Sequence, residues 1–299
     1  MSREWISAKE RSNALAIRLL VATALALGRP IGRALLYPVC AYFVLFSRTA
    51  SAASRQYLAR ALGREPGMQD VFRHFYCFAT VALDRMLLLR DRFEAFDVRV
   101  HGEDILLDAL ARGESCFLLG AHLGSYEVLR TIGREKRAKV GMLMFEVNPK
   151  LGAVARAINP DLEADVIPMG TPESMIRVSE RLERGEWVGM LGDRRLYDNG
   201  SVAVPFFGEP AALPTAPFRI AAMLGRPIVL MVGLYRGGNR YDLHFERLVD
   251  APSLERKRRD TQIREWATLY SARLEHYCRL APDNWFNFYD FWAHAKPAD

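Results

Sequence analysis

The stretch "SCFLLGAH" (115–122), continued by "LGSYEVLRTIG" (123–133), shows how this chain folds. An apolar run of this length between polar residues is typical of a buried strand, and the segment after the glycine has the apolar spacing of a short helix. We therefore expect a strand that ends at His122, a turn at Gly124 and a short helix over 125–133.

The same alternation of apolar runs and amphipathic segments continues along most of the chain after Phe96. Further strands are expected at 97–102, 139–145, 164–169, 187–191, 227–233 and 241–246. Helices are expected at 105–113, 150–158, 215–224 and 259–280, with another that begins at Pro172 and is capped by Thr171. Strands separated by helices predict an α/β domain over 96–299, with a mostly parallel central sheet flanked by helices.

The first 95 residues have a different composition. Residues 14–47 are mostly apolar, are interrupted by three arginines and break at Gly-Arg-Pro (28–30). The longest uncharged stretch, 34–47, has 14 residues, whereas a helix that crosses a bilayer needs roughly 20. We predict an N-terminal helical, membrane-associated region over 1–95, containing two short apolar helices that form a membrane-embedded or interfacial hairpin. A pair of core helices is the alternative. A longer amphipathic helix is expected at 69–89.

The chain carries a formal net charge of +6, which favours an acidic partner such as nucleic acid, anionic lipid or an acidic protein. It has neither zinc-finger spacing nor a glycine-lysine phosphate loop, so no nucleic-acid partner is predicted. The four cysteines stand far apart, and His122 lacks a second histidine at helical spacing. The sequence therefore predicts no metal and no cofactor.

His122 and Glu127 are the candidate catalytic pair. Five residues along a regular helix turn about 500°, so the two side chains can meet only if the chain bends between them, and Gly124 allows this. The carboxylate would then accept from one imidazole nitrogen and leave the other free to take a proton. This arrangement predicts that His122 is a general base.

Ser125 lies within the same motif and is a possible nucleophile of a hydrolase. It belongs to no Gly-x-Ser-x-Gly elbow, however, and its position favours a helix cap. The nucleophile would then arrive with the substrate as a hydroxyl group. A base of this kind beside an apolar, membrane-facing region indicates acyl transfer.

Two longer blocks carry a family resemblance: "GAHLGSYE" (120–127) and "GDRRLYDNGSVAVPFFGEPAALPTAPFRIAAMLGRPIVLMV" (192–232). With the apolar N-terminus, they resemble the bacterial lipid A biosynthesis acyltransferases, the late lauroyl and myristoyl transferases, within the wider glycerolipid acyltransferase superfamily. By this resemblance His122 and Glu127 correspond to the catalytic His-x4-Asp/Glu dyad. Many relatives have Pro-Asp-x-Asp-x-Gly where this chain has "LGDRRLYDNG" (191–200), which leaves the acceptor open.

The resemblance also implies substrate-binding residues. They are Asn148 with the downstream Arg156, the block Asp193, Arg194 and Arg195, and, within the block 204–215, Phe207 and Gly208. Arginines after a strand suit the phosphate of an acceptor or of a phosphopantetheine arm. Asp193 would orient one of these arginines or assist a substrate hydroxyl, and "VPFFG" (204–208) would line an acyl-chain slot or form a core strand.

Two further features are given no catalytic role at this point. His74 lies on the helix expected at 69–89 among aromatic neighbours. The aromatic segment "WFNFYDFW" (285–292) is expected to seal the core, with docking at the membrane interface as the alternative.

These observations predict an O-acyltransferase. It would move a fatty acyl group from an acyl carrier protein or coenzyme A thioester to a hydroxyl of a lipid A-like or other glycolipid acceptor. It would act at the bacterial inner membrane with its catalytic domain facing the cytoplasm. The alternatives are a membrane-associated esterase or lipid hydrolase, and an acyltransferase for a lipid unrelated to lipid A.

Overall fold

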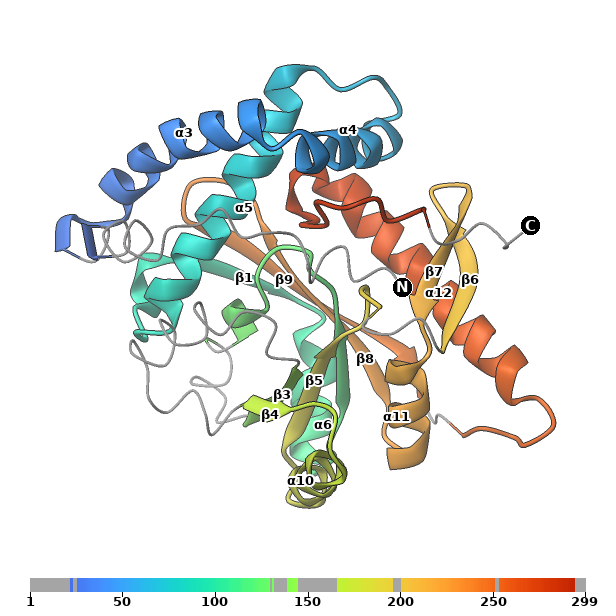
Figure 1. Cartoon of the computed structure of the whole chain (residues 1–299). Helices are drawn as coiled ribbons and strands as arrows, with labels where there is room; N and C mark the ends of the chain where they lie inside the picture. The colour runs from blue at the N-terminus through green and yellow to red at the C-terminus, as the bar shows by residue number, and fades with distance from the viewer. Residues whose placement is uncertain are drawn as a thin grey trace.

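A computed structural model describes residues 22–23, 26–129, 131, 139–144, 166–195, 200–250 and 253–293 (Figure 1). Its α-helices are α3 (Arg29–Phe46), α4 (Arg48–Leu62), α5 (Met68–Leu88), α6 (Glu103–Ala111), α10 (Pro172–Glu183), α11 (Ala216–Leu224) and α12 (Arg259–Leu280). Its short 3₁₀ helices are η1 (Phe93–Ala95), η2 (Tyr126–Val128) and η3 (Pro282–Asn284). Its strands are β1 (Asp97–His101), β2 (Phe117–Gly120), β3 (Val140–Met144), β4 (Val166–Pro168), β5 (Trp187–Leu191), β6 (Ser201–Phe206), β7 (Glu209–Pro214), β8 (Ile228–Tyr235) and β9 (Arg240–Val249).

The central sheet has the strand order β1-β9-β8-β2-β5-β3-β4. All neighbouring pairs are parallel except β8 and β9, which are antiparallel. The predicted α/β fold with a mostly parallel sheet is therefore confirmed. Residues expected to form a helix at 150–158 lie outside the described part of the chain.

Local sequence signals account for several element boundaries. Thr171 caps α10 by accepting from the backbone N–H of Ser174, as predicted. The helix expected at 125–133 begins with the short η2, and Ser125 occupies its N-cap position without a side-chain capping bond. Strands β6 and β7 form a separate antiparallel hairpin. Its two turn residues, Phe207 and Gly208, have φ of 54° and 79°, the positive values that a two-residue hairpin turn requires.

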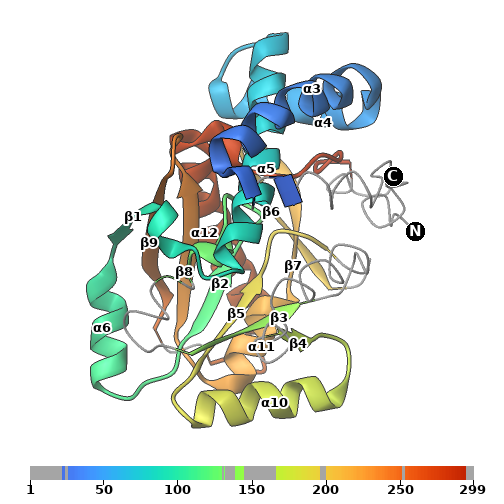
Figure 2. The same cartoon turned by 90° about the vertical axis from the view of Figure 1, so that its left-hand side faces the viewer.

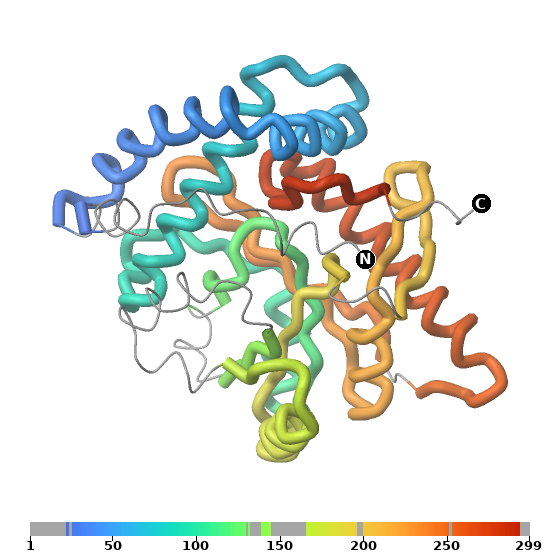
Figure 3. Tube along the Cα trace, in the orientation of Figure 1, coloured from blue at the N-terminus to red at the C-terminus, as the bar shows by residue number. Residues whose placement is uncertain are grey.

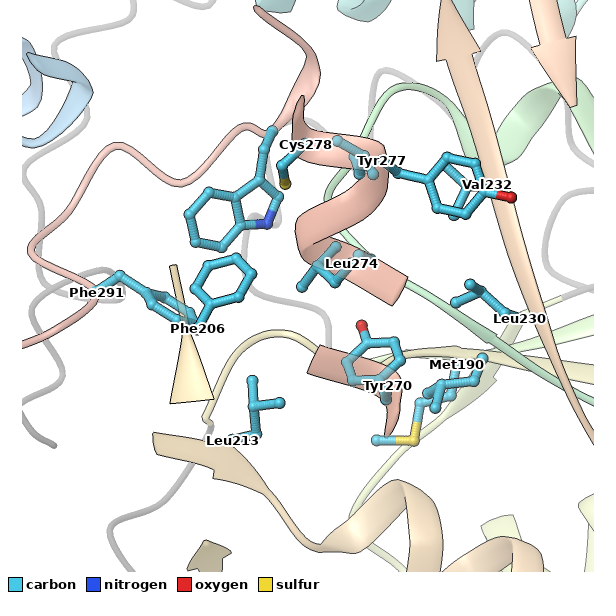
Figure 4. Close-up of a cluster of buried hydrophobic side chains, with 14 of the residues drawn as sticks. Met190, Phe206, Leu213, Leu230, Val232, Tyr270, Leu274, Tyr277, Cys278 and Phe291 are labelled. Carbon is cyan, nitrogen blue, oxygen red and sulfur yellow. The ribbon is translucent and has the colours of Figure 1, made fainter. Parts of the chain in front are cut away.

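Helices cover both faces of the sheet. On one face, α6 contributes Leu106 and Ala109 to a core with residues of β2, β8 and β9. On the other face, α11 and α12 contribute to a second core, and Figure 4 shows the part of this core around α12. There, Tyr270 and Leu274 of α12 lie among Met190, Leu230 and Val232 of the sheet. This second core also contains Leu36, Tyr57 and Val71 of the N-terminal helices.

Helices α3 and α4 lie across one end of the molecule, opposite α10 (Figures 1 and 2). The break predicted at 28–30 is present, because α3 begins at Arg29 after Gly28 in a positive-φ conformation. In the described part of the chain, no helix alone has the length and hydropathy of a bilayer-crossing segment. Helices α3 and α4 meet that test only as a pair, bent by 94° at the break between them.

Candidate active site

The register of two parallel strands brings His122 and Asp193 together. In the β2–β5 pair, Gly120 lies opposite Leu191, and the backbone N–H of Gly192 donates to Gly120 O at 2.9 Å. His122 lies two residues after Gly120, and Asp193 lies two residues after Leu191. The two side chains therefore leave the sheet side by side. Polar side chains at the carboxyl ends of parallel strands are the usual origin of α/β active sites.

A short hydrogen bond joins the two side chains. Nδ1 of His122 lies 2.7 Å from Oδ1 of Asp193, and the backbone N–H of His122 is 3.1 Å from each carboxylate oxygen. The Asp193 side chain is fully buried, whereas the His122 side chain is 30% exposed. Because an ionised carboxylate only accepts hydrogen bonds, Nδ1 carries the proton and Nε2 keeps its lone pair. His122 is thus prepared to take a proton at Nε2.

The surrounding charges keep this pair in the required protonation state. Burial opposes ionisation of Asp193, but His122 and Arg194 outweigh it and hold the pKa of this carboxyl well below its usual range. Burial and the neighbouring Arg194 lower the pKa of His122, and Asp193 opposes them in part. Near neutral pH, the site therefore holds a carboxylate and a neutral imidazole.

A tight turn directs the chain after His122, as predicted from the glycine. Gly124 has φ of +66°, and a Cβ added there would lie 1.9 Å from the carbonyl oxygen of Gly233. Its backbone N–H donates to Asn284 O at 2.8 Å, and that of Ser125 donates to Gly233 O at 2.7 Å. The turn is held between β8 and the segment after α12, so the position of His122 depends on both.

The predicted hydrogen bond between Glu127 and His122 is corrected by the structure. The carboxylate on Nδ1 of His122 is that of Asp193, and Glu127 Oε1 lies 2.8 Å from Nε of Arg85. The Arg85 guanidinium also lies over the ring of Tyr126, 5.3 Å from its centre. In η2, Glu127 turns towards α5, where a buried carboxylate finds a cationic partner. Asp193, expected to orient an arginine or a substrate hydroxyl, orients the histidine.

Of the other predicted site residues, the two arginines after Asp193 lie near the pair. Arg194 lies beside the pair, and its guanidinium donates to Asn287 Oδ1 and to Phe286 O, both at 2.7 Å. Arg195 follows it and is half-buried. Asn148 and Arg156 lie outside the described residues.

Phe207 and Gly208 form the tip of the β6–β7 hairpin, which packs against α12. The backbone N–H of Phe207 donates to the side chain of Glu275, and the Arg279 guanidinium lies 4.8 Å from the centre of the Phe207 ring. The ring of Phe207 contacts Tyr57, Phe206 and Arg279, none of which belongs to the loop that carries His122.

The C-terminal aromatic segment contributes residues that sequence reasoning missed. Trp285 and Asn287 donate from Nε1 and Nδ2 to Oδ2 of Asp193, at 3.0 and 3.1 Å. The segment passes between α4 and the loop after β2 (Figure 3), where Trp285 contacts the ring of Tyr57 and pairs with Leu123. Its predicted role in sealing the core is confirmed by the burial of four of its rings, those of Trp285, Phe286, Phe291 and Trp292. The one available signal was the presence of indole and amide donors in an apolar segment.

His101, Asp242 and His244 form a further polar cluster, where β1 pairs with β9 at the edge of the sheet. Their potential ligand atoms lie within 4.8 Å of one another. Both oxygens of Asp242 accept from Arg240, at 2.9 and 3.0 Å, and Arg236 Nε lies 3.4 Å from the same carboxylate. Two guanidinium groups in this position oppose the binding of a cation, so we assign no metal site here.

A carboxylate-held histidine at the carboxyl ends of parallel strands is an arrangement that α/β enzymes use for general acid–base chemistry. The sequence model of the bacterial lipid A biosynthesis acyltransferases matches residues 58–294. The chain therefore belongs to that family, as its motifs suggested, and it is an O-acyltransferase whose substrates are an acyl donor and a lipid acceptor.

Comparisons with individual proteins give weaker similarity. Among solved structures, the 1-acyl-sn-glycerophosphate (LPA) acyltransferase PlsC from Thermotoga maritima is similar over 82% of this chain and 97% of its own. The two chains are 14% identical and superpose with a TM-score of 0.37. No curated protein matches the sequence.

Proposed function

We propose that this enzyme transfers a fatty acyl group from an acyl carrier protein or coenzyme A thioester to a hydroxyl of a lipid A-like or other glycolipid acceptor. The observation that carries the proposal is the His122–Asp193 pair, whose 2.7 Å bond leaves Nε2 of the imidazole as an acceptor. A base in this state suits a substrate whose reacting group is a neutral hydroxyl.

In the proposed reaction, Nε2 of His122 takes the proton of the acceptor hydroxyl while its oxygen attacks the thioester carbonyl carbon. The new C–O bond forms, the C–S bond breaks, and the imidazolium returns its proton to the departing thiolate. Asp193 holds the imidazole in its tautomer and steadies the imidazolium. Arg195 and one edge of Arg194 are proposed to bind a phosphate of donor or acceptor.

Glu127 remains a proposed site residue, but acts through Arg85. Its carboxylate neutralises and positions that guanidinium at 2.8 Å, and the positive charge of Arg85 contributes to the lowered pKa of His122. Asn148, Arg156, Phe207 and Gly208 are retained as proposed substrate-binding residues because of their places in the family motifs.

Replacing His122 with alanine tests the function. We expect kcat for acyl transfer to fall about 10³-fold, within the range that a general base contributes, while the thermal unfolding midpoint changes little. The assay follows a radiolabelled acyl thioester, with total lipid extract as acceptor, and separates acylated lipid from free fatty acid. Full activity of the variant would remove His122 from the mechanism. Free fatty acid as the product of the wild-type enzyme would favour the esterase alternative.

We also propose that the N-terminal region, 1–95, contacts the cytoplasmic face of the bacterial inner membrane. Both arginines of α3 point towards the protein: Arg29 pairs with Asp84 at 2.6 Å, and Arg33 donates to Gly238 O. The opposite side of α3 carries no charge and exposes large apolar side chains. These are Ile31, Leu35, Val39, Tyr42, Leu45 and Phe46, whereas the exposed Tyr37 lies beside α5 and contacts the ring of Tyr76. A continuous apolar face next to interfacial tyrosines suits a helix lying in a bilayer surface.

Charged substitutions at the end of α3 test the membrane proposal. The double variant Leu45→Glu/Phe46→Glu should bind phosphatidylglycerol-containing vesicles about 100-fold more weakly, because two large apolar side chains no longer enter the bilayer. Cosedimentation with the vesicles measures this binding. The control is Ile176→Glu/Met223→Glu, which changes two equally exposed apolar residues on α10 and α11. Equal binding of both variants and the wild type would contradict the proposal.

A further inference from the structure

The carboxylate of Asp193 is surrounded by donors from two parts of the chain. His122 supplies its backbone N–H and Nδ1–H, with Nδ1 2.7 Å from Oδ1. Trp285 and Asn287 supply N–H groups to Oδ2 at 3.0 and 3.1 Å, from side chains that are 0% and 1% exposed. The two C-terminal donors occupy Oδ2 and leave Oδ1 directed at the imidazole.

The segment that carries these donors is itself held on several sides. The backbone N–H of Phe286 donates to His122 O at 2.8 Å. On the helical side, His74 is fully buried and places Nε2 2.8 Å from Trp285 O and Nδ1 2.8 Å from Ser54 Oγ. Burial lowers the pKa of His74 to about 4, although its bond to Trp285 O opposes this, so the imidazole is neutral and donates from Nε2. The indole is thus fixed with respect to both α5 and the loop that carries His122.

We propose that Trp285 and Asn287 are positioning residues for the reaction, acting through Asp193 on His122. This inference rests on the proposed role of His122 as base. A buried carboxylate without enough donors is less firmly oriented towards its partner and carries more uncompensated negative charge. Two neutral N–H donors prevent both outcomes without adding a charge next to the base. Asn287 also accepts from Arg194 at 2.7 Å, which fixes the amide with its NH₂ group towards Asp193.

The variants Trp285→Phe and Asn287→Leu remove these donors one at a time, and the second does so with little change of side-chain shape. For each variant we expect kcat to fall about tenfold, because one hydrogen bond to a charged group is lost in the reacting complex. For Trp285→Phe, which leaves the contact between Asn287 and Arg194 in place, we also expect KM to be unchanged. With fewer donors the carboxylate charge is less neutralised, so it stabilises the imidazolium and raises the pKa of His122. The acidic limb of the kcat/KM profile should therefore move to higher pH. A purely structural role would not produce this shift.

The control is Phe291→Leu, which removes ring volume from the same aromatic cluster, 4.8 Å from Trp285, but no donor to Asp193. It should lower the thermal unfolding midpoint and leave the acidic limb unchanged. Folded Trp285→Phe and Asn287→Leu variants with wild-type kcat and pH profile would overturn the inference, as would a shift of equal size in Phe291→Leu. Loss of activity in His122→Ala together with normal donor variants would reject this inference alone, whereas an active His122→Ala would reject the proposed function.

Discussion

Replacing Asp193 with asparagine is expected to lower kcat by about 10³- to 10⁴-fold. All the described side-chain and backbone partners of Asp193 are donors: His122, Trp285 and Asn287. An amide NH₂ group at this position must face one of these donors. The change that costs least is for His122 to accept this NH₂ group at Nδ1, which leaves the ring proton on Nε2. Because His122 is neutral in both proteins, raising the pH should not restore activity. Thiol release from the donor, followed from pH 5 to 9, measures this.

The matched change at the other carboxylate is Glu127→Gln. It leaves the His122–Asp193 bond in place but replaces the carboxylate that pairs with Arg85 by a neutral amide. We expect a loss of about 1–2 kcal/mol in the free energy of unfolding, since a partly buried cation keeps a weaker acceptor, and at most a tenfold fall in kcat. The reverse result, with Glu127→Gln inactive and Asp193→Asn active, would restore the dyad predicted from the sequence.

Replacing Gly124 with alanine is expected to be the most destabilising single change near the site. The added Cβ would lie 1.9 Å from Gly233 O, at a φ of +66° that L-residues rarely adopt. The turn must shift away from β8, and we expect a loss of at least 3 kcal/mol in the free energy of unfolding. Activity should fall by about 100-fold in the folded fraction, because a displacement of about 1 Å at His122 spoils the reacting geometry. Chemical denaturation and the transfer assay measure the two effects.

Gly113→Ala is the control for the backbone conformation alone. Gly113 has φ of +63° and no atom within 4 Å of an added Cβ. The substitution should lower the free energy of unfolding by about 1–2 kcal/mol, because it places a side chain in the left-handed region. If Gly124→Ala proves no more destabilising than Gly113→Ala, close packing of the turn against β8 is not what holds His122.

The order and type of most elements were predictable from local patterns. Strand β5 and helix α12 lie within a residue of their expected bounds, and Thr171 caps α10 as its position indicated. Apolar periodicity, turn residues and caps act over a few residues, so a single chain carries enough information to place them. The β6–β7 hairpin was not recognised because its turn, Phe207-Gly208, puts a phenylalanine where asparagine or glycine is usual.

The candidate site was only partly predictable. His122 was identified because a histidine follows a buried strand at a glycine turn, and Asp193 was singled out by a motif but given another partner. The glutamate nearest in sequence was the predicted partner of His122, but η2 directs Glu127 towards Arg85. Trp285 and Asn287 lie more than 160 residues beyond His122 in the chain, and no spacing rule connects such distant positions.

By itself, the amino-acid sequence determined that this chain is an α/β acyltransferase, and it singled out the histidine at the end of its first buried strand as the candidate base. Only the tertiary structure decided which carboxylate that histidine faces. The decision rests on the register of β2 and β5, which sets Gly120 opposite Leu191, and on the return of the C-terminal segment across the site. The strand register and the path of the C-terminal segment both depend on how the whole core packs. The free energy of that packing comes from contacts between residues far apart in the sequence, so no local pattern reveals it.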